Sequence, residues 1–375
     1  MPEAIAPDDV LRDAEVPATD AAFWLAISRV PHIGPARIAR LVERFGSLEV
    51  AWCAPRQALL AVLEPKPLSE LLAVRARADP QRELERITAL GMRVTHPGDR
   101  EYPRLLAEIS GRPSILYVRG EIVTDDDASV AIVGTRRATP YGLQCAGRIG
   151  AELAQAGVTV ISGLARGVDG VAHRAALESG GRTIAVLGSG LDVIYPGEHR
   201  LLAEKIAAQG AVISEFPPGA KPDAQNFPAR NRIISGMSLG VVVVEAPRRS
   251  GALITATFAA DQGREVFVVP GSVFAQASEG TNAMLRDGAR IVRDGADVLD
   301  DLNLGMGRVS SVQQAQMPLD DNERLLYMAL RDEARHIDEL AEEAGLGAGQ
   351  AGALLLTMEL KGLVRNHGAQ FYVRR

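Results

Sequence analysis

The sequence has very little cysteine: only Cys53 and Cys145 occur among its 375 residues. This excludes a disulfide framework and a cysteine-rich metal site, and it favours a reducing compartment. No apolar run approaches the roughly 20 residues that a membrane-spanning helix needs. The acidic first residues lack the basic and then apolar order of a secretory signal peptide. We therefore expect a cytoplasmic protein that does not enter a membrane.

Aromatic residues are scarce as well, at 4% of the chain, and acidic residues outnumber basic ones. The net charge of −6 counts against a protein that binds a polyanion over its whole surface. A local cationic groove remains open, and it depends on where particular arginines lie. The hydrophobic content of 47% indicates a folded chain, long enough for two or three domains.

The pattern along the chain predicts five segments. Residues 1–20 are expected to form a flexible leader, and residues 21–90 a small helical domain of the SAM or helix–hairpin–helix type. Residues 91–302 alternate strand-like and helical stretches, which predicts an α/β core. Residues 303–318 are rich in Gly, Ser and Gln and indicate a linker. Residues 319–375 have the order of three helices and a hairpin, which is typical of a winged helix.

The core is predicted to be a Rossmann-like, doubly wound and mostly parallel sheet. Its expected strands are almost continuously apolar, as strands covered on both faces are. They are SVAIVGT, VTVISGLA, RTIAVLGSG, AVISEF, LGVVVVEA and REVFVVPG. Residues 92–122, which precede them, are expected to add strands and a helix at one edge.

Two nucleotide-binding motifs are missing from the ends of these strands. Neither GxGxxG nor GxxxxGK[ST] occurs, since Gly188-Ser189-Gly190 has no third glycine at the required spacing. We therefore expect no nucleotide cofactor. Asp125, Asp126 and Asp127 have no His or Glu nearby to complete a metal site, and we expect them to lie in a solvated loop.

A hydrolase triad is suggested by Ser162, Asp169 and His173, but the last two are four residues apart on one predicted helix. We expect Asp169 to be the N-cap of that helix and His173 to support the loop, so no catalytic residue is predicted. Glu245, with SGALITA and PGS, is similar to Rossmann enzymes that cleave nucleotides, although their PGGxGT core is absent. Cleavage of an N-glycosidic bond or a phosphate ester therefore stays as the alternative function.

Glycines and arginines at the strand ends predict a phosphate-binding surface, because ligands of open α/β sheets bind beyond the carboxyl ends of the strands. Gly134 lets the backbone approach a ligand, and Arg136 can fork onto phosphate oxygens. The next strand end repeats this combination with Ser162, Gly163 and Arg166. The alternatives are a solvated arginine in GTRR and a turn that serves only packing in SGLARG.

The segment FPARNRIISG, 227–236, places Arg230, Asn231 and Arg232 near the start of a predicted helix whose first turn suits Pro228. Cations there are unfavourable by about 0.3–1 kcal/mol because of the helix dipole. Glu215 and Glu245 are the internal acids that could pair with them. Two glutamates are too few for all the arginines expected at this edge, which favours an external polyanion. Those arginines are Arg136, Arg166, Arg230 and Arg232.

Phe227 stands beside these arginines in a chain that is poor in aromatic residues. Single-stranded nucleic acid is bound by cations along its backbone and by bases that stack on aromatic rings. The alternative is a core phenylalanine that packs against the helix start. The residues thus favour a single-strand binder over two other classes, a nucleotide-cleaving enzyme and a scaffold whose rim binds an acidic protein.

The order of these stretches resembles the bacterial DNA-processing protein A family (DprA/Smf), over residues from about 95 to 300. The stretches include AIVGTRRATPYG, ISGLARGVDGVAH, IAVLGSGLDVIYP, FPARNRIISG and VVVVEAPRRSGALITA. His32 in the N-terminal turn and the few cations on the third helix of the C-terminal segment depart from the family pattern.

The resemblance implies a non-enzymatic homodimer that binds single-stranded DNA and loads a RecA-type recombinase during natural transformation. A single-strand-binding protein is a further candidate partner. Matched by motif, the implied pocket is taken from GTR, SGLAR and FPARNR. Its residues are Arg136, Ser162, Gly163, Arg166, Phe227, Arg230, Asn231 and Arg232.

Overall fold

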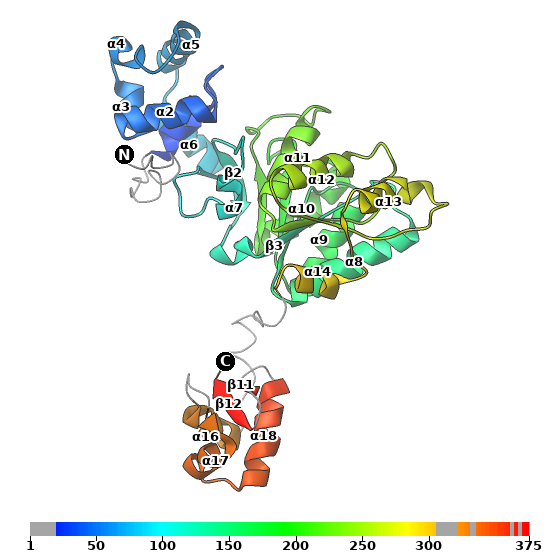
Figure 1. Ribbon diagram of the computed structural model, residues 1–375. Helices are drawn as coiled ribbons and strands as arrows, with labels where there is room; N and C mark the ends of the chain where they lie inside the picture. The colour runs from blue at the N-terminus through cyan, green and yellow to red at the C-terminus, as the bar shows by residue number, and fades with distance from the viewer. Residues whose placement is uncertain (1–19, 305–320, 331–334, 361–363, 367–369, 375) are drawn as a thin grey trace, which may run out of the picture. The chain divides into compact units, whose positions relative to one another are not determined.

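The computed structural model describes residues 20–304, 321–330, 335–360, 364–366 and 370–374 (Figure 1). The expected leader, apart from its last residue, and most of the expected linker lie outside these ranges. The chain divides into two compact units, Met1–Gly305 and Met306–Arg375, and each is considered by itself.

The first unit begins with a helical part, blue in Figure 1. Four of its six helices begin with a proline or a capping side chain: α2 and α5 have proline in the first turn, and Ser47 and Asp79 accept hydrogen bonds from the first turns of α3 and α6. In the turn before α2, His32 adopts a φ of 65°, a conformation that glycine favours. The helices are α1 (Ala21–Ser28), α2 (Pro35–Phe45), α3 (Leu48–Cys53), α4 (Arg56–Leu59), α5 (Pro65–Arg75) and α6 (Pro80–Ala89).

The helical part packs directly on the sheet that follows it. The ring of Trp24 stacks on His96 with centroids 4.4 Å apart. The Arg29 guanidinium donates to the Tyr117 hydroxyl at 3.0 and 3.2 Å. Leu25, Ile27 and other apolar side chains of these helices share one core with Tyr117 and the neighbouring strands.

The described residues of the first unit contain one nine-stranded sheet, in the order β1-β2-β6-β5-β4-β3-β7-β8-β9. The predicted Rossmann-like fold is confirmed: each of the six expected strands forms, and from β6 to β9 all neighbours are parallel. The segment before them adds antiparallel β1 and β2, as expected. The strands are β1 (Arg93–Thr95), β2 (Leu116–Gly120), β3 (Ser129–Val133), β4 (Thr159–Ser162), β5 (Thr183–Leu187), β6 (Ala211–Ser214), β7 (Gly240–Val243), β8 (Glu265–Val268) and β9 (Arg290–Ile291).

Helices cover both faces of this sheet, which explains why the central strands β3 to β7 are buried and almost continuously apolar. On one face α7, α11 and α12 pack on residues such as Val133 and Ile161; on the other, α8, α9 and α14 pack on Ile132 and Val160 (Figure 1). The helices are α7 (Arg104–Ala107), α8 (Pro140–Gln155), α9 (Val168–Glu178), α10 (Arg200–Gln209), α11 (Asn226–Gly236), α12 (Gly251–Asp261), α13 (Glu279–Arg286) and α14 (Gly295–Asp301), with short 3₁₀ turns η1 (Thr124–Asp127), η2 (Gly197–His199) and η3 (Gln276–Ser278).

The second unit has the predicted winged-helix order, with one additional short strand, β10. Its three strands pair in the order β10-β12-β11, and Leu340, Leu355 and Met358 form its core with other apolar residues. The elements are α16 (Asp321–Ala329), β10 (Arg335–His336), α17 (Ile337–Ala344), α18 (Ala348–Leu360), β11 (Val364–Asn366) and β12 (Phe371–Arg374).

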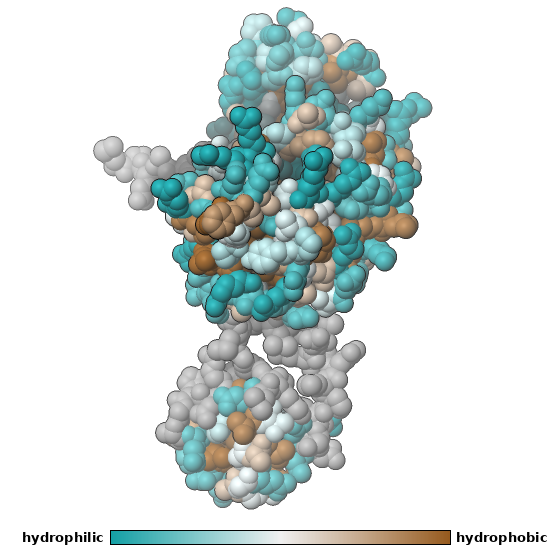
Figure 2. Space-filling view, turned by 90° about the vertical axis from the view of Figure 1, so that its right-hand side faces the viewer, coloured by the Kyte–Doolittle hydropathy of each residue, from teal (hydrophilic) through white to brown (hydrophobic). Residues whose placement is uncertain are grey.

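The molecular face in Figure 2 is mainly hydrophilic, and its hydrophobic side chains form separate small groups. None of the helices in the described ranges has both the length and the apolar character needed to cross a membrane.

The expectation that the three aspartates form a solvated loop is wrong for Asp126. Its side chain is 5% exposed and accepts hydrogen bonds from Arg182 at 2.9 and 3.0 Å and from the Thr159 hydroxyl at 2.7 Å. It also accepts from the backbone N–H of Val123 at 2.9 Å. Asp126 therefore ties η1 to the start of β4 and to the segment before β5.

Replacing Asp126 by Ala should lower the free energy of unfolding by about 1–3 kcal/mol, because buried donors lose their acceptor. Asp125→Ala is the matched control, since the Asp125 side chain is exposed on the same turn. Urea unfolding of the two variants beside the wild type measures the difference. Equal stability of all three proteins would show that the buried carboxylate contributes nothing.

Candidate nucleic-acid interface

The carboxyl ends of β5, β4, β3 and β7 open on one edge of the sheet. Between β3 and β7 the strand order reverses, because the chain proceeds from β3 to β4 on one side and reaches β7 only after β6. Such switch points are where open α/β sheets bind their ligands. The loops here contain Arg136 and Arg137 after β3, and Arg248 and Arg249 after β7.

Arg136 and Phe227, both predicted site residues, lie together at this edge. The Arg136 guanidinium carbon is 5.1 Å from the centroid of the Phe227 ring, a cation–π contact. Tyr195, 42% exposed, stands beside the same ring at a centroid distance of 5.9 Å. Gly188 leaves room for that ring, because a Cβ atom there would be 3.1 Å from Phe227 Cδ1. Tyr195 was not predicted, although GSGLDVIYP places it just after a strand end.

Arg230 lies beneath this group rather than at the surface. Its side chain is 5% exposed, and one nitrogen donates to the carbonyls of Gly163, at 2.7 Å, and Val186. A second nitrogen donates to the Asn231 side chain at 3.2 Å. Burial lowers the pKa of Arg230 to about 10, opposed by the charge of Asp169. A side chain at Gly163 would collide with this guanidinium, which explains the glycine.

Two further predicted arginines have internal partners. Arg232 forms a bidentate pair with Glu215 at 2.7 and 2.8 Å, the alternative that the sequence left open. Arg166 pairs with Glu198 at 2.6 and 2.7 Å, with both side chains about half exposed (55% and 53%). The inference that the arginines lack internal partners is therefore wrong for Arg230, Arg232 and Arg166. In addition, α11 begins at Asn226, so Arg230 and Arg232 lie beyond its first turn.

Glu245, the other expected partner, forms no ion pair with any arginine in the described part of the chain. Its carboxylate is buried at 2% exposure and accepts from the Thr139 hydroxyl at 2.6 Å and the Thr139 N–H at 2.8 Å. A Cβ atom at Gly142 would lie 2.3 Å from a Glu245 oxygen. Glu245 thus fills the space between β7 and the start of α8, below the exposed arginines.

Ser162, Asp169 and His173 are buried, and the His173 ring pairs with Thr183 rather than with Asp169, so the three do not form a hydrolase triad. The Ser162 hydroxyl donates to the Ile132 carbonyl at 2.6 Å. Asp169 is not the N-cap of α9, which is Gly167; its carboxylate accepts from the N–H groups of Gly163 and Ala165. The three side chains therefore hold the loop after β4 in shape.

The exposed arginines without a polar partner are the remaining candidates for a ligand. Within the described ranges, the side chains of Arg137, Arg248 and Arg249 are exposed and form no ion pair. Among the described residues, the Phe227 ring is the only polar or aromatic partner of the Arg136 side chain. The sequence signal for the three was present in GTRR and EAPRRSG, but from these two stretches the prediction selected only Arg136.

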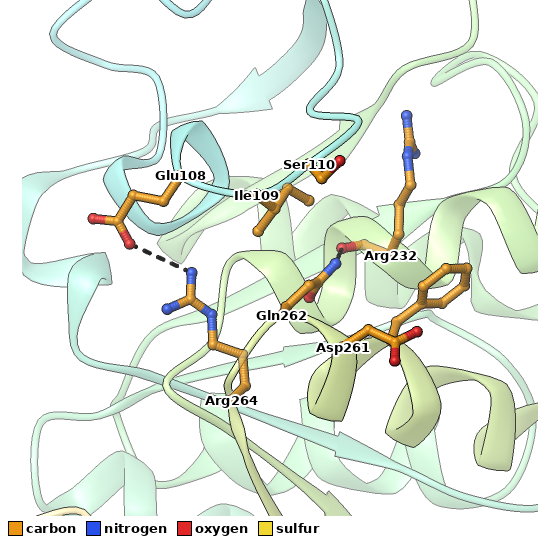
Figure 3. A pocket seen from close by; sticks show the side chains of 8 residues that line it. Glu108, Ile109, Ser110, Arg232, Asp261, Gln262 and Arg264 are labelled. Atoms are coloured by element: carbon orange, nitrogen blue, oxygen red, sulfur yellow. Dashed lines mark hydrogen bonds and ion pairs between the residues drawn. The ribbon is translucent and has the colours of Figure 1, made fainter. Parts of the chain in front are cut away.

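A cavity of about 380 Å³ lies elsewhere, between α7, α11 and the end of α12 (Figure 3). Arg264 faces Glu108 there at 3.6 Å, and the Gln262 amide donates to the Arg232 carbonyl at 3.0 Å. The cavity is at the opposite end of α12 from Ser250 and the strand ends. It is therefore separate from the candidate interface.

Comparison with known proteins identifies the family. The model described as DNA recombination-mediator protein A matches residues 93–303, and the DprA winged helix domain matches residues 311–370. The chain belongs to the DNA recombination-mediator protein A family. Protein Smf of Synechocystis sp. is 35% identical over 95% of this chain and 99% of its own length. Protein Smf of Escherichia coli is 37% identical over 92% and 93%.

Solved structures of the recombination-mediator family share the fold. DNA processing protein A of Streptococcus pneumoniae matches with a TM-score of 0.66 and 32% identity, over 75% of this chain and 97% of that chain. The Helicobacter pylori protein, described for its single-stranded DNA binding mode, matches with a TM-score of 0.51 and 31% identity, over 56% and 95%. Membership in the family confirms the resemblance and associates the chain with DNA processing.

The buried His173, behind the loop after β4, makes the stability of the folded protein depend on pH. Thr183 donates to the Val160 carbonyl, so its oxygen accepts the Nδ1 proton of His173 at 2.7 Å. Burial lowers the pKa of His173 to about 3. The ordinary pKa of a histidine is 6.5. Between pH 6.5 and about 3, His173 is therefore protonated in the unfolded chain but neutral in the folded chain. Stability is therefore complete above pH 6.5 and is lost on acidification.

We expect His173→Gln, which keeps an N–H donor, to remove up to about 1.4 kcal/mol per pH unit from the slope of unfolding free energy between pH 6.5 and 4.5. Denaturant unfolding at several pH values measures that slope. His32→Asn, at an exposed histidine with a left-handed backbone, should leave it unchanged. An identical slope in the wild type and the Gln variant would contradict the assignment.

Proposed function

We propose that this protein binds single-stranded DNA along the switch-point edge, protects it, and loads a RecA-type recombinase onto it. The observation that carries the proposal is the Arg136–Phe227–Tyr195 group beside the unpaired Arg137, Arg248 and Arg249. Guanidinium groups bind phosphates, and exposed ring faces stack on bases, at about 1–3 kcal/mol per base. Membership in a DNA-processing family supports the same ligand.

The proposed contacts fall into two groups. Arg136 and Phe227 bind the strand directly, and the strand ends beneath them pack closely at Gly134 and Gly163, where a Cβ atom would collide with Val168 and with the Arg230 guanidinium. Arg166 joins them by exchanging its exposed Glu198 partner for a phosphate, because such exposed pairs contribute only about 0–1 kcal/mol.

The second group of predicted residues supports the first from below. Ser162 and Arg230 fix the strand ends on which the loops rest, and Asn231 links Arg230 to the start of α12 through the Gly251 carbonyl at 3.2 Å. Arg232 holds Glu215 and thereby the end of β6. We propose that these four act on the DNA through the residues above them.

The proposal includes a non-enzymatic mode of action, a homodimer and a cytoplasmic location. The nucleotide-cleaving alternative depended on Glu245, and both of its oxygens are occupied by Thr139. Incubation with nucleoside monophosphates tests that alternative, because released base or phosphate would establish an enzyme.

Replacing Arg136 and Arg137 by Ala together should weaken binding of an oligothymidylate and reduce the salt slope by roughly 0.7 per lost phosphate contact. The fold should remain intact, because neither side chain is buried. Fluorescence anisotropy at two salt concentrations, against a duplex of equal length, measures affinity and preference. Arg82→Ala together with Arg86→Ala, at two exposed arginines of α6, is the charge-matched control.

Unchanged affinity of the double variant would reject this edge as the binding site, and absence of binding by the wild type would reject single-stranded DNA as the ligand. Recombinase loading has its own measurement. Filament formation on a strand coated with single-strand-binding protein should accelerate with the wild type and not with the Arg136/Arg137 variant.

A further inference from the structure

The loop between β8 and η3 presents two consecutive apolar side chains to solvent. Val273 is 78% exposed and Phe274 is 96% exposed. Single exposed apolar residues are ordinary in soluble proteins. Here, however, the Ala275 N–H donates to the Ser272 carbonyl at 3.0 Å, so the two residues form the corner of a tight turn. Such corners usually carry Gly, Pro, Asn, Asp or Ser.

The turn is anchored at both of its ends. Before it, the Tyr141 hydroxyl donates to the Pro270 carbonyl at 2.8 Å, and Gly271 exchanges hydrogen bonds with the Asn282 side chain at 3.2 and 3.4 Å. After it, the Ser278 N–H donates to the Ala275 carbonyl at 2.9 Å. The backbone at Phe274 is therefore fixed, and its ring projects into solvent.

This turn opens on the same edge as the candidate interface, because β8 is parallel to β7 and adjacent to it. In strand order the edge has Tyr195 after β5, Arg136 and Arg137 after β3, Arg248 and Arg249 after β7, and Phe274 after β8. Neighbouring strands are about 4.8 Å apart, so β5 and β8 are separated by roughly 19 Å. The unpaired arginines thus lie between the rings of Tyr195 and Phe227 on one side and the exposed ring of Phe274 on the other.

We infer that Phe274 is a second base-stacking contact, which extends the interface for single-stranded DNA from Phe227 across the switch point to β8. The inference rests on the proposed function and adds a residue and a direction to it. A strand with unpaired bases fits this surface, because it presents phosphates to the arginines and ring faces to the aromatic residues at the same time.

The test compares the full-length protein and its variants on two ligands. One is an oligothymidylate of about 16 nucleotides, the upper end of known site sizes for single-strand binding folds. The other is an abasic strand with the same number of phosphates. Phe274→Ala should weaken oligothymidylate binding about fivefold or more, with no change in the salt slope, since no phosphate contact is lost. On the abasic strand it should equal the wild type.

Matched variants separate stacking from other uses of the ring. Phe274→Trp should bind oligothymidylate at least as tightly as the wild type, whereas Phe274→Leu, apolar but not aromatic, should be weakened like the Ala variant. Leu90→Ala, at a residue 49% exposed at the end of α6, should have no effect.

Equal affinity of Phe274→Ala and the wild type for oligothymidylate would overturn the inference and leave the proposed function intact. A wild type that binds neither strand would overturn both. The inference also fails if Phe274→Ala lowers the affinity for both strands equally. It fails as well if sedimentation shows that Phe274→Ala changes the oligomeric state of the protein while Phe274→Leu does not. Equal loss on both strands would show that the ring does not stack on bases, and a changed oligomer would assign the ring to a contact between protein chains.

Discussion

The buried guanidinium of Arg230 is the interaction on which the candidate interface depends. It joins the carbonyl ends of β4 and β5, at Gly163 and Val186, to helix α11. Phe227 is three residues earlier on the same helix, so fixing Arg230 also fixes the ring beside Arg136. A buried charge is costly unless its hydrogen bonds are satisfied. Asp169 supplies the compensating charge, and it also accepts from the N–H groups of the loop after β4.

Much of the fold follows from local pattern, because strands buried on both faces are nearly continuous runs of Val, Ile and Ala between glycines. Parallel strands also end at the same edge of a sheet, and from this the sequence correctly predicted that Arg136 and Phe227 lie together. The burial of Arg230 could not be predicted, since spacing identifies a cation but not the carbonyls below it. The prediction that Asp126 lies in a solvated loop was wrong for the same reason, because its partners Thr159 and Arg182 are distant in sequence. Phe274 has no local pattern that marks it as exposed.

The overall charge of −6 describes this protein poorly because its arginines serve two different purposes. Arg182, Arg230 and Arg232 are bound to carboxylates or carbonyls and hold strands and helices together. Arg137, Arg248 and Arg249 are exposed without such partners around the switch point. An acidic chain can therefore present a cationic edge, and the attraction it exerts on a polyanion is local rather than a property of the whole surface.

The proposed contacts also determine what kind of strand the edge would select. Guanidinium groups bound to phosphates carry no sequence information, and a phenyl ring stacks on any base. The edge should therefore tolerate every sequence. Discrimination between single and double strands then comes from the bases, because a ring such as Phe227 can stack only on a base released from its duplex neighbours. Arg136 is held beside the Phe227 ring by a contact worth only about 0.5–1 kcal/mol. It is therefore already close to the phosphate of a nucleotide stacked on that ring and can turn toward it at little cost.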